Sequence, residues 1–286
     1  KLWNSFRLVK GWKVSESRDA FYTENGDDIH EWMKYRLQQT VESVNAYFDK
    51  FRISDALMEL YKLTRDDYSG WYLEMIKPAY GEAIPKKDFD EVISIFDAIL
   101  KLLHPFMPFI TEELWQNVKD RGEDYINLQE WPELTSHEET IDENVFKLIT
   151  EVRAARNENG ISPKKVASLQ VSGNQKAYQQ SFGIVAKLGN VDTLEADENP
   201  NAFKKLVGTD EVTIGFEDFV KKVDNEAISK EIKRLEGFLI GIDKKLSNER
   251  FMANAKPEII TNERNKKADA ESKIAIIRES LAGLEG

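Results

Sequence analysis

Apolar residues recur at intervals of three and four along most of this chain, the spacing that one face of an α-helix produces. Up to residue 132 the pattern predicts a bundle of five helices, because no alternating strand pattern interrupts them. Helices are expected over 1–13, from Asp27 or Asp28 to about Phe51, from Ser54 to Pro78, from Asp88 to His104 and from Pro108 to Lys119. The polar stretch Ser15–Gly26 is expected to be a loop, and Ile126–Pro132 to be extended.

Capping residues and prolines set the predicted helix ends. Asp27 or Asp28 and Ser54 are read as N-caps, and Asp88 with Glu91 three positions later resembles a capping box. Pro105 ends a helix near His104 and Pro108 opens the next, so Leu102–Trp115 forms a corner between two buried helices. The apolar stripes expected in the core are Leu2, Trp3, Phe6 and Val9; Ile29, Met33, Leu37, Val41, Val44, Phe48 and Phe51; Leu57, Leu60, Tyr61, Tyr68, Trp71, Tyr72 and Met75; and Phe106, Phe109, Ile110, Leu114 and Trp115.

Residues 133–224 are predicted to form a polar linker and a small α+β module. Asp142 caps a helix that Gly160 should end. Three β-like segments and one intervening helix follow: Val166–Val171, Val191–Leu194 and Glu211–Phe216, with the helix at Asn174–Leu188.

From residue 225 the apolar positions follow a heptad repeat. Two such stretches flank a break at Ser247–Pro257, which predicts an antiparallel coiled-coil hairpin over 225–286. Gly237 and Gly241 interrupt the first helix at a cost of about 1 kcal/mol each relative to alanine, and close packing of the two helices is one reason to keep them. The seam residues are Ile228, Ile232, Leu235, Leu239, Ile242 and Leu246, then Ala270, Ile274, Ile277, Leu281 and Leu284.

Composition narrows the class of protein. There is no cysteine among the 286 residues, so disulfides and thiolate metal sites are excluded and a reducing cytoplasm is expected. No apolar run is long enough to cross a membrane and no leader peptide opens the chain. The chain starts in mid-pattern at Lys1, so we expect it to be part of a larger protein. We also expect a monomer.

The residues of enzyme chemistry are not gathered in this sequence. His30, His104 and His137 are scattered without a second ligand at helical spacing, so no metal site is expected. Glu112 and Glu113 are adjacent and point in different directions on a helix, which does not suit a carboxylate pair. There is no phosphate-binding glycine loop, so we expect no catalysis and no cofactor in this chain.

Charge is unevenly distributed and points to nucleic acid. The formal net charge is −11, but residues 217–286 are neutral and residues 1–18 are basic. Asn4 and Arg7 lie one helical turn apart and Lys10 continues the row, a set suited to bases and phosphates. Trp32 and Arg36 form a second such pair, in which Trp32 is either an exposed stacking platform or part of the core. Cations off the coiled-coil seam that could meet phosphates are Arg234, Lys244, Lys245, Arg250, Lys256, Arg264 and Lys267.

Several of these segments together resemble one known family. The opening KLWN with Arg7, the run WYLEMIKP, the corner LLHPFMPFITEELW and the pair Trp131–Pro132 resemble the anticodon-binding domain of class I aminoacyl-tRNA synthetases of the valine, isoleucine, leucine and methionine subgroup. The corner and the tail KKLSNERF are most similar to the valyl enzymes and their C-terminal coiled-coil arm.

The resemblance implies a partner and a division of labour. Residues 1–132 would read the anticodon loop of a valine tRNA, with Asn4, Arg7, Lys10, Trp32 and Arg36 as candidate contacts. The arm, 225–286, would lean on the outer corner of the tRNA. ATP would bind in a catalytic domain that this chain lacks.

Two other interpretations remain open from the sequence. The coiled coil could be a scaffold that binds partner helices or dimerises, as the acidic net charge allows. Another synthetase of the same subgroup would have the same architecture and differ only in the tRNA that it selects.

Overall fold

The computed structural model describes residues 1–132, 136–173, 175–196, 199, 201–217, 219, 225–247, 260–267, 270, 271 and 274. The chain forms two compact units, Lys1–Phe219 and Val220–Gly286. It is mainly helical with a small four-stranded mixed sheet, which confirms the predicted fold class. In these ranges no helix is both long and apolar enough to cross a membrane.

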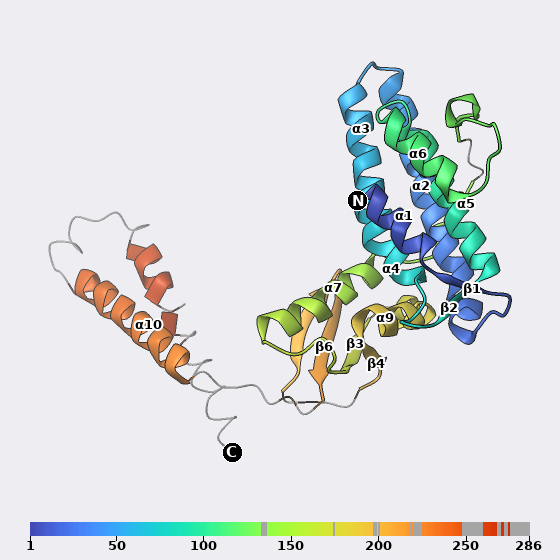
Figure 1. The fold of residues 1–286 in the computed structure, drawn as a ribbon. Helices are drawn as coiled ribbons and strands as arrows, with labels where there is room; N and C mark the ends of the chain where they lie inside the picture. The colour runs from blue at the N-terminus through green and yellow to red at the C-terminus, as the bar shows by residue number, and fades with distance from the viewer. Residues whose placement is uncertain are drawn as a thin grey trace. The chain divides into compact units, whose positions relative to one another are not determined.

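The first half of the larger unit is a bundle of helices that run alongside one another (Figure 1). Three of its segments, α3, η2 and α4, follow one another directly, and the middle one is wound as a π-helix. A shorter π-helix, η1, likewise runs straight into α2. The elements are α1 (Leu2–Lys10), η1 (Tyr22–Gly26), α2 (Asp27–Phe48), α3 (Ile53–Lys62), η2 (Leu63–Tyr72), α4 (Leu73–Ile76), α5 (Lys86–Leu103) and α6 (Pro108–Val118).

Three predicted N-caps are wrong. No side chain caps α2, α3 or α5, whose N-cap residues are Gly26, Arg52 and Pro85. The first turn of α2 continues from η1, so its amide groups need no cap there. Asp88 points into the core instead of capping α5, because it pairs there with His30 and Arg18.

Two predictions about loops are also wrong. The stretch Ser15–Gly26, predicted to be a loop, includes η1 and the last residue of β1 (Lys13–Ser15), which forms a short parallel pair with β2 (Ala83–Pro85). The stretch expected to be extended contains a turn of 3-10 helix, η3 (Ile126–Leu128). These elements have only three to five residues, which is too few for a repeating pattern of hydrophobic positions to reveal them.

The predicted core is largely confirmed, with exceptions at the ends of the stripes. Phe51 is 89% exposed and Phe109 is 91% exposed, because they lie at helix ends where no neighbouring element covers them. Trp3, Leu57 and Tyr61 are also exposed, since their stripe extends beyond the bundle's contact face. The predicted positions that are buried include Val9, Ile29, Met33, Leu37, Val41, Val44, Leu60, Tyr68, Tyr72, Met75, Leu114 and Trp115.

The corner between α5 and α6 is confirmed. Helix α5 ends at Leu103, and Pro108 occupies the first turn of α6. The ring of His104 fastens the corner, with its Nδ1 2.8 Å from the hydroxyl of Thr111. Because Thr111 also donates to the carbonyl of Met107, the two helix ends are held by side chains as well as by the prolines.

The second half of the larger unit is the α+β module. Its sheet has the order β4-β3-β6-β5, parallel between β3 and β4 and antiparallel elsewhere. The carboxylate of Asp142 caps α7 by accepting from the amide of Asn144, and Gly160 follows the helix with φ +61°, as predicted. The elements are α7 (Glu143–Glu158), β3 (Ala167–Ser172), α8 (Gln175–Gln180), α9 (Phe182–Gly189), β4 (Val191–Thr193), β5 (Phe203–Val207) and β6 (Asp210–Phe216).

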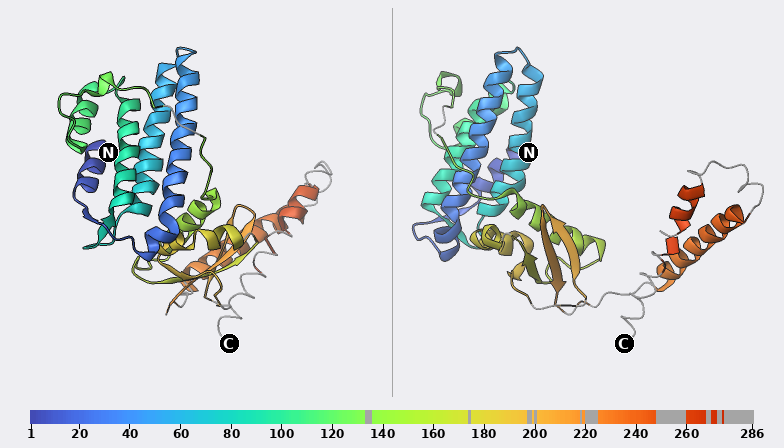
Figure 2. Two further views of the ribbon diagram at one scale, coloured as in Figure 1. Left: turned by 90° about the vertical axis from the view of Figure 1, so that its right-hand side faces the viewer. Right: turned by 180° about the vertical axis from the view of Figure 1, so that it is seen from behind.

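Two features of the module differ from the prediction. Strand β5 was not expected, because lysines at 204 and 205 hide its alternation. The single helix expected between β3 and β4 is two helices, α8 and α9, separated by Ser181. Figure 2 shows the module at one end of the bundle.

Bundle and module share one hydrophobic core. Phe146 of α7 packs against Trp32 and Trp71, with ring centroids 5.0 and 4.8 Å apart. Lys187 of α9 donates from its ammonium to the carbonyls of Met75 and Lys77, at 2.7 Å each. These contacts join the module to the end of α4, so the two halves form one body.

The smaller unit contains α10 (Asn225–Leu246), with residues 260–267 forming part of a second helix. Leu235 packs with Ala270 and Ile274, and ion pairs join Asp243 to Lys267 at 2.7 Å and Lys245 to Glu263 at 3.4 Å. Higher numbers on one helix meet lower numbers on the other, so the described parts are antiparallel, as predicted. Ile277, Leu281 and Leu284 lie outside the described residues.

A buried carboxylate ties four elements of the bundle together. The side chain of Asp88 on α5 is fully buried and accepts hydrogen bonds from Arg18 at 3.0 and 3.1 Å. His30 of α2 lies 3.1 Å from Asp88 through Nε2, and its Nδ1 lies 2.8 Å from the hydroxyl of Tyr72. Gly26 is required beside them, because a Cβ there would lie 2.5 Å from a carboxylate oxygen of Asp88.

We expect Asp88→Asn to lower the free energy of unfolding by about 3 kcal/mol, because His30 and Arg18 lose charge-assisted hydrogen bonds to a buried carboxylate, although Arg18 keeps its ion pair with Asp27. Urea denaturation measures the change. Asp90→Asn on the same helix is the matched control, since Asp90 pairs with Lys86 at the surface and should have little effect. Equal stability of the two variants would show that the buried carboxylate is not a stabilising contact.

Acid should destabilise the bundle through the same carboxylate. Burial alone would raise the pKa of Asp88, but hydrogen bonds from His30 and Arg18 hold it below the ordinary value of 3.8. The unfolded chain therefore binds this proton more tightly, and stability falls as pH drops through and below about 4. Unfolding free energies measured between pH 6 and pH 3 should decline less steeply for Asp88→Asn than for the unchanged chain.

Candidate nucleic-acid interface

Helix α1 presents one face to the bundle and the other to solvent. Ser5 and Val9 are its buried residues, and the hydroxyl of Ser5 lies 3.0 Å from that of Ser69 on η2. The opposite face therefore carries Asn4 and Arg7, both exposed. The structure brings these two predicted residues together, one turn apart on the same surface.

The cations of α1 differ in whether their side chains already have a partner within the chain. Within the described ranges the side chain of Arg7 makes no ion pair or hydrogen bond, and it is exposed. The ammonium of Lys10 donates to the carbonyl of Asn117 at 3.1 Å and so anchors α1 to α6. Of the two predicted contacts, Arg7 is the available one and Lys10 has a structural contact already.

Two further exposed residues of this surface were not predicted as contacts. Trp3 is 45% exposed and Leu8 is 41% exposed, and both flank the Asn4–Arg7 row. A helical wheel centred on Arg7 would have placed Leu8 on the outer face, since Leu8 follows Asn4 by one turn. The surface therefore combines an amide and a guanidinium with apolar side chains.

The predicted pair Trp32 and Arg36 does not form an exposed stacking site. Trp32 is only 3% exposed because Phe146 of the module covers it, which sequence periodicity could not foresee. Arg36 forms an ion pair with Asp67 at 3.1 Å. Burial raises the pKa of Asp67 despite the opposing effect of Arg36.

The hollow beside this pair is acidic. Its volume is about 530 Å³, and four carboxylates line it against only two cations, Arg36 and Lys147. A phosphate would meet net negative charge there. Trp32 and Arg36 are therefore core and ion-pair residues in this structure. The lining carboxylates are Asp67, Glu139, Glu143 and Glu151.

The cations predicted on the arm fall into groups. Lys245 pairs with Glu263, and Lys267 pairs with Asp243 and lies 3.8 Å from Glu271. Lys244 and Arg264 are exposed and have no ion pair with any described residue. Arg234 is exposed and has an interaction of its own. Arg250 and Lys256 lie outside the described residues.

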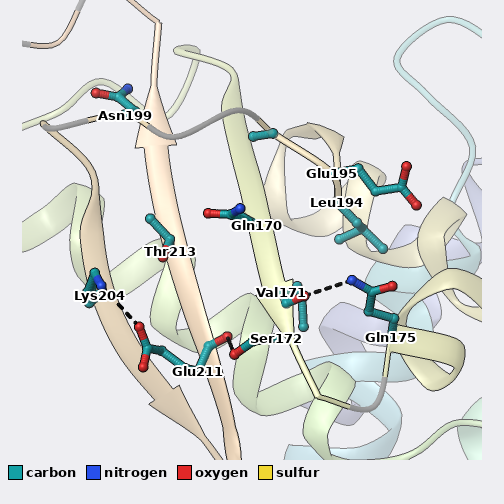
Figure 3. Close-up of a pocket in the computed structure, with 11 residues that line it drawn as sticks. Gln170, Val171, Ser172, Gln175, Leu194, Glu195, Asn199, Lys204, Glu211 and Thr213 are labelled. Atoms are coloured by element: carbon teal, nitrogen blue, oxygen red, sulfur yellow. Dashed lines mark hydrogen bonds and ion pairs between the residues drawn. The ribbon is translucent and has the colours of Figure 1, made fainter.

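Another hollow lies on the polar face of the sheet and contains none of the predicted contacts (Figure 3). Its volume is about 700 Å³. Lys204 pairs there with Glu211 at 3.2 Å, and the amide of Gln175 donates to the carbonyl of Val171 at 2.9 Å. Its one lysine is therefore neutralised, which gives the face no surplus positive charge.

The three histidines each have a local partner. His30 and His104 make the contacts given above, and His137 lies 2.9 Å through Nδ1 from a carboxylate oxygen of Glu31. In the part of the chain that the structure describes, no three histidine, aspartate or glutamate side chains are placed to hold a metal ion.

Two family models match the chain. Residues 30–171 match the anticodon-binding domain of tRNA ligases, and residues 223–285 match the valyl-tRNA synthetase tRNA-binding arm. The second match begins close to the boundary between the two compact units, at Phe219 and Val220.

Individual relatives agree over the whole length. The chain is 42% identical to a valine–tRNA ligase of Phocaeicola vulgatus over 100% of its residues, and 39% identical to one of Christiangramia forsetii over 99%. It is 31% identical to the valine–tRNA ligase of Agrobacterium fabrum over 98%. The chain spans about a third of the length of these relatives, 31% to 33%. It belongs to the valyl-tRNA synthetase family and comprises the anticodon-binding domain and the tRNA-binding arm.

Proposed function

We propose that this chain is the tRNA-binding part of an ATP-dependent valine–tRNA ligase. In this proposal the bundle contacts the anticodon loop of a valine tRNA, and the arm contacts the outer corner of the same molecule. The chemistry occurs in a catalytic domain that is absent from this chain. The monomeric state and cytoplasmic location expected from the sequence belong to the same proposal.

The observation that carries the proposal is the outer face of α1. Asn4 and Arg7 are exposed there, and Arg7 is not neutralised by any described carboxylate. On a chain of net charge −11, an unpaired guanidinium beside an amide is a local site for phosphate or a base edge. The exposed side chains of Trp3 and Leu8 add surface on which an unstacked base can pack.

Two separate RNA contacts would orient the tRNA. An RNA held at two distant points has its remaining end placed by geometry, which lowers the entropic cost of reaching a catalytic centre. Binding at both points also raises affinity beyond that of either alone. The division of the chain into two compact units supports such a two-point arrangement.

We expect Arg7→Ala to weaken binding of a valine tRNA transcript about tenfold and to reduce the salt slope of log K by about 1, because one phosphate or base contact is lost. Filter binding at several salt concentrations measures both quantities. Lys86→Ala is the charge-matched control, since Lys86 is already paired with Asp90 and lies on another helix.

Three outcomes of this experiment are informative. Equal losses for Arg7→Ala and Lys86→Ala would mean that only net charge matters and would remove the α1 surface from the proposal. Salt-independent binding of the unchanged chain would contradict phosphate contacts altogether. Tighter binding of a competing isoleucine tRNA would contradict the valine assignment.

A further inference from the structure

The two glycines of α10 lie on the side of the helix that faces away from the arm's seam. Gly237 follows Leu235, and Gly241 follows Leu239, by two positions each, and two residues turn an α-helix by about 200°. Both glycines are exposed. A Cβ at either position would have no described atom within 4 Å.

The arm's own packing therefore does not explain these glycines. We expected close approach of the two helices as a reason for them, and their outward position contradicts that reason. Glycine destabilises the interior of a helix relative to alanine because its unfolded backbone has more freedom. Alanine would fit both positions and favour the helix, which leaves the choice of glycine without a reason among the described residues.

The surroundings of the glycines indicate what lies there. Lys233 and Lys244 are exposed on the same side and make no ion pair with any described residue. Phe238 is 46% exposed and Ile240 is 58% exposed beside them. Lys233 and Lys244 are separated by about 16 Å along the helix, at 1.5 Å per residue, so they bracket the glycines.

Between residues 232 and 247 the glycine side of α10 carries no acidic residue. The acidic residues of 232–247 are Glu236 and Asp243, each of which follows a seam residue directly. Asp243 points toward the second helix, where it pairs with Lys267 at 2.7 Å. A surface with unpaired lysines, exposed apolar side chains and bare backbone complements a polyanion that also has apolar parts.

We propose that this outward face of α10 is where the arm contacts RNA, with the ribose–phosphate backbone lying against the strip at Gly237 and Gly241. Lys233 and Lys244 neutralise phosphates at its two ends, and Phe238 and Ile240 contact riboses or bases. Glycine permits such close approach of a ligand to backbone. This inference rests on the proposed function and adds which face binds and why its glycines are kept.

The test exploits opposite effects on stability and binding. In the full chain, Gly237→Ala with Gly241→Ala should raise the Tm of the arm by roughly 4 °C or more, since alanine favours the helix. The same variant should bind valine tRNA transcript about tenfold more weakly, because two methyl groups separate RNA from the backbone. Circular dichroism and filter binding measure the two quantities.

Two further variants distinguish the possible failures. Asn265→Ala adds a helix-favouring residue on the second helix and should leave the affinity unchanged. Lys244→Gln should weaken binding and reduce its salt dependence. If Lys244→Gln weakens binding and the glycine variant does not, the role of the glycines is wrong while the arm still binds RNA.

If neither Lys244→Gln nor the glycine variant changes affinity, this face does not contact RNA and the proposal is overturned. Sedimentation of the unchanged chain tests whether a second copy of the chain, instead of RNA, covers this face. A mass that doubles with concentration and returns to that of one chain in the glycine variant would assign the face to self-association, and would also overturn the proposal.

Discussion

A carboxylate removed from water holds the bundle in register. Asp88 can be buried because Arg18 and His30 donate to it, and His30 in turn contacts Tyr72. These four side chains come from the segment after β1, from α2, from η2 and from α5. Since a buried charge is tolerated only with such partners, the four elements have one arrangement in which the network is satisfied. Through Arg18, the segment that follows α1 and β1 is fixed to the bundle by this network.

The surfaces proposed to meet RNA are placed on that rigid support. Helix α1 is fixed to η2 through Ser5 and Ser69 and to α6 through Lys10, which leaves Asn4 and Arg7 on the outside. On the arm, too, lysines beside the seam stabilise the fold, because they pair with carboxylates of the opposite helix. In both units the cations nearest the packing contacts serve the fold, and those turned away from it remain available to a ligand.

Many carboxylates of the chain likewise pair with its own cations. The acidic hollow beside Trp32 and Arg36 uses its carboxylates to hold cations of the chain itself, as Asp67 does for Arg36. A net charge of −11 therefore does not prevent contact with a polyanion. It limits that contact to the few places where a cation has no carboxylate beside it, which favours a defined orientation over diffuse attraction.

The helical bundle, the corner at His104 and the antiparallel arm follow from the sequence alone, because each depends on local periodicity or on proline geometry. The sequence also places Asn4 and Arg7 on one face of one helix. Three other features depend on how distant elements pack: Phe146 covers Trp32, Asp88 faces inward and Lys10 is anchored to α6. Each of these depends on a partner 58 to 114 positions away in the chain. Residue spacing fixes which side chains share a helix face, and packing of distant elements fixes which faces remain exposed.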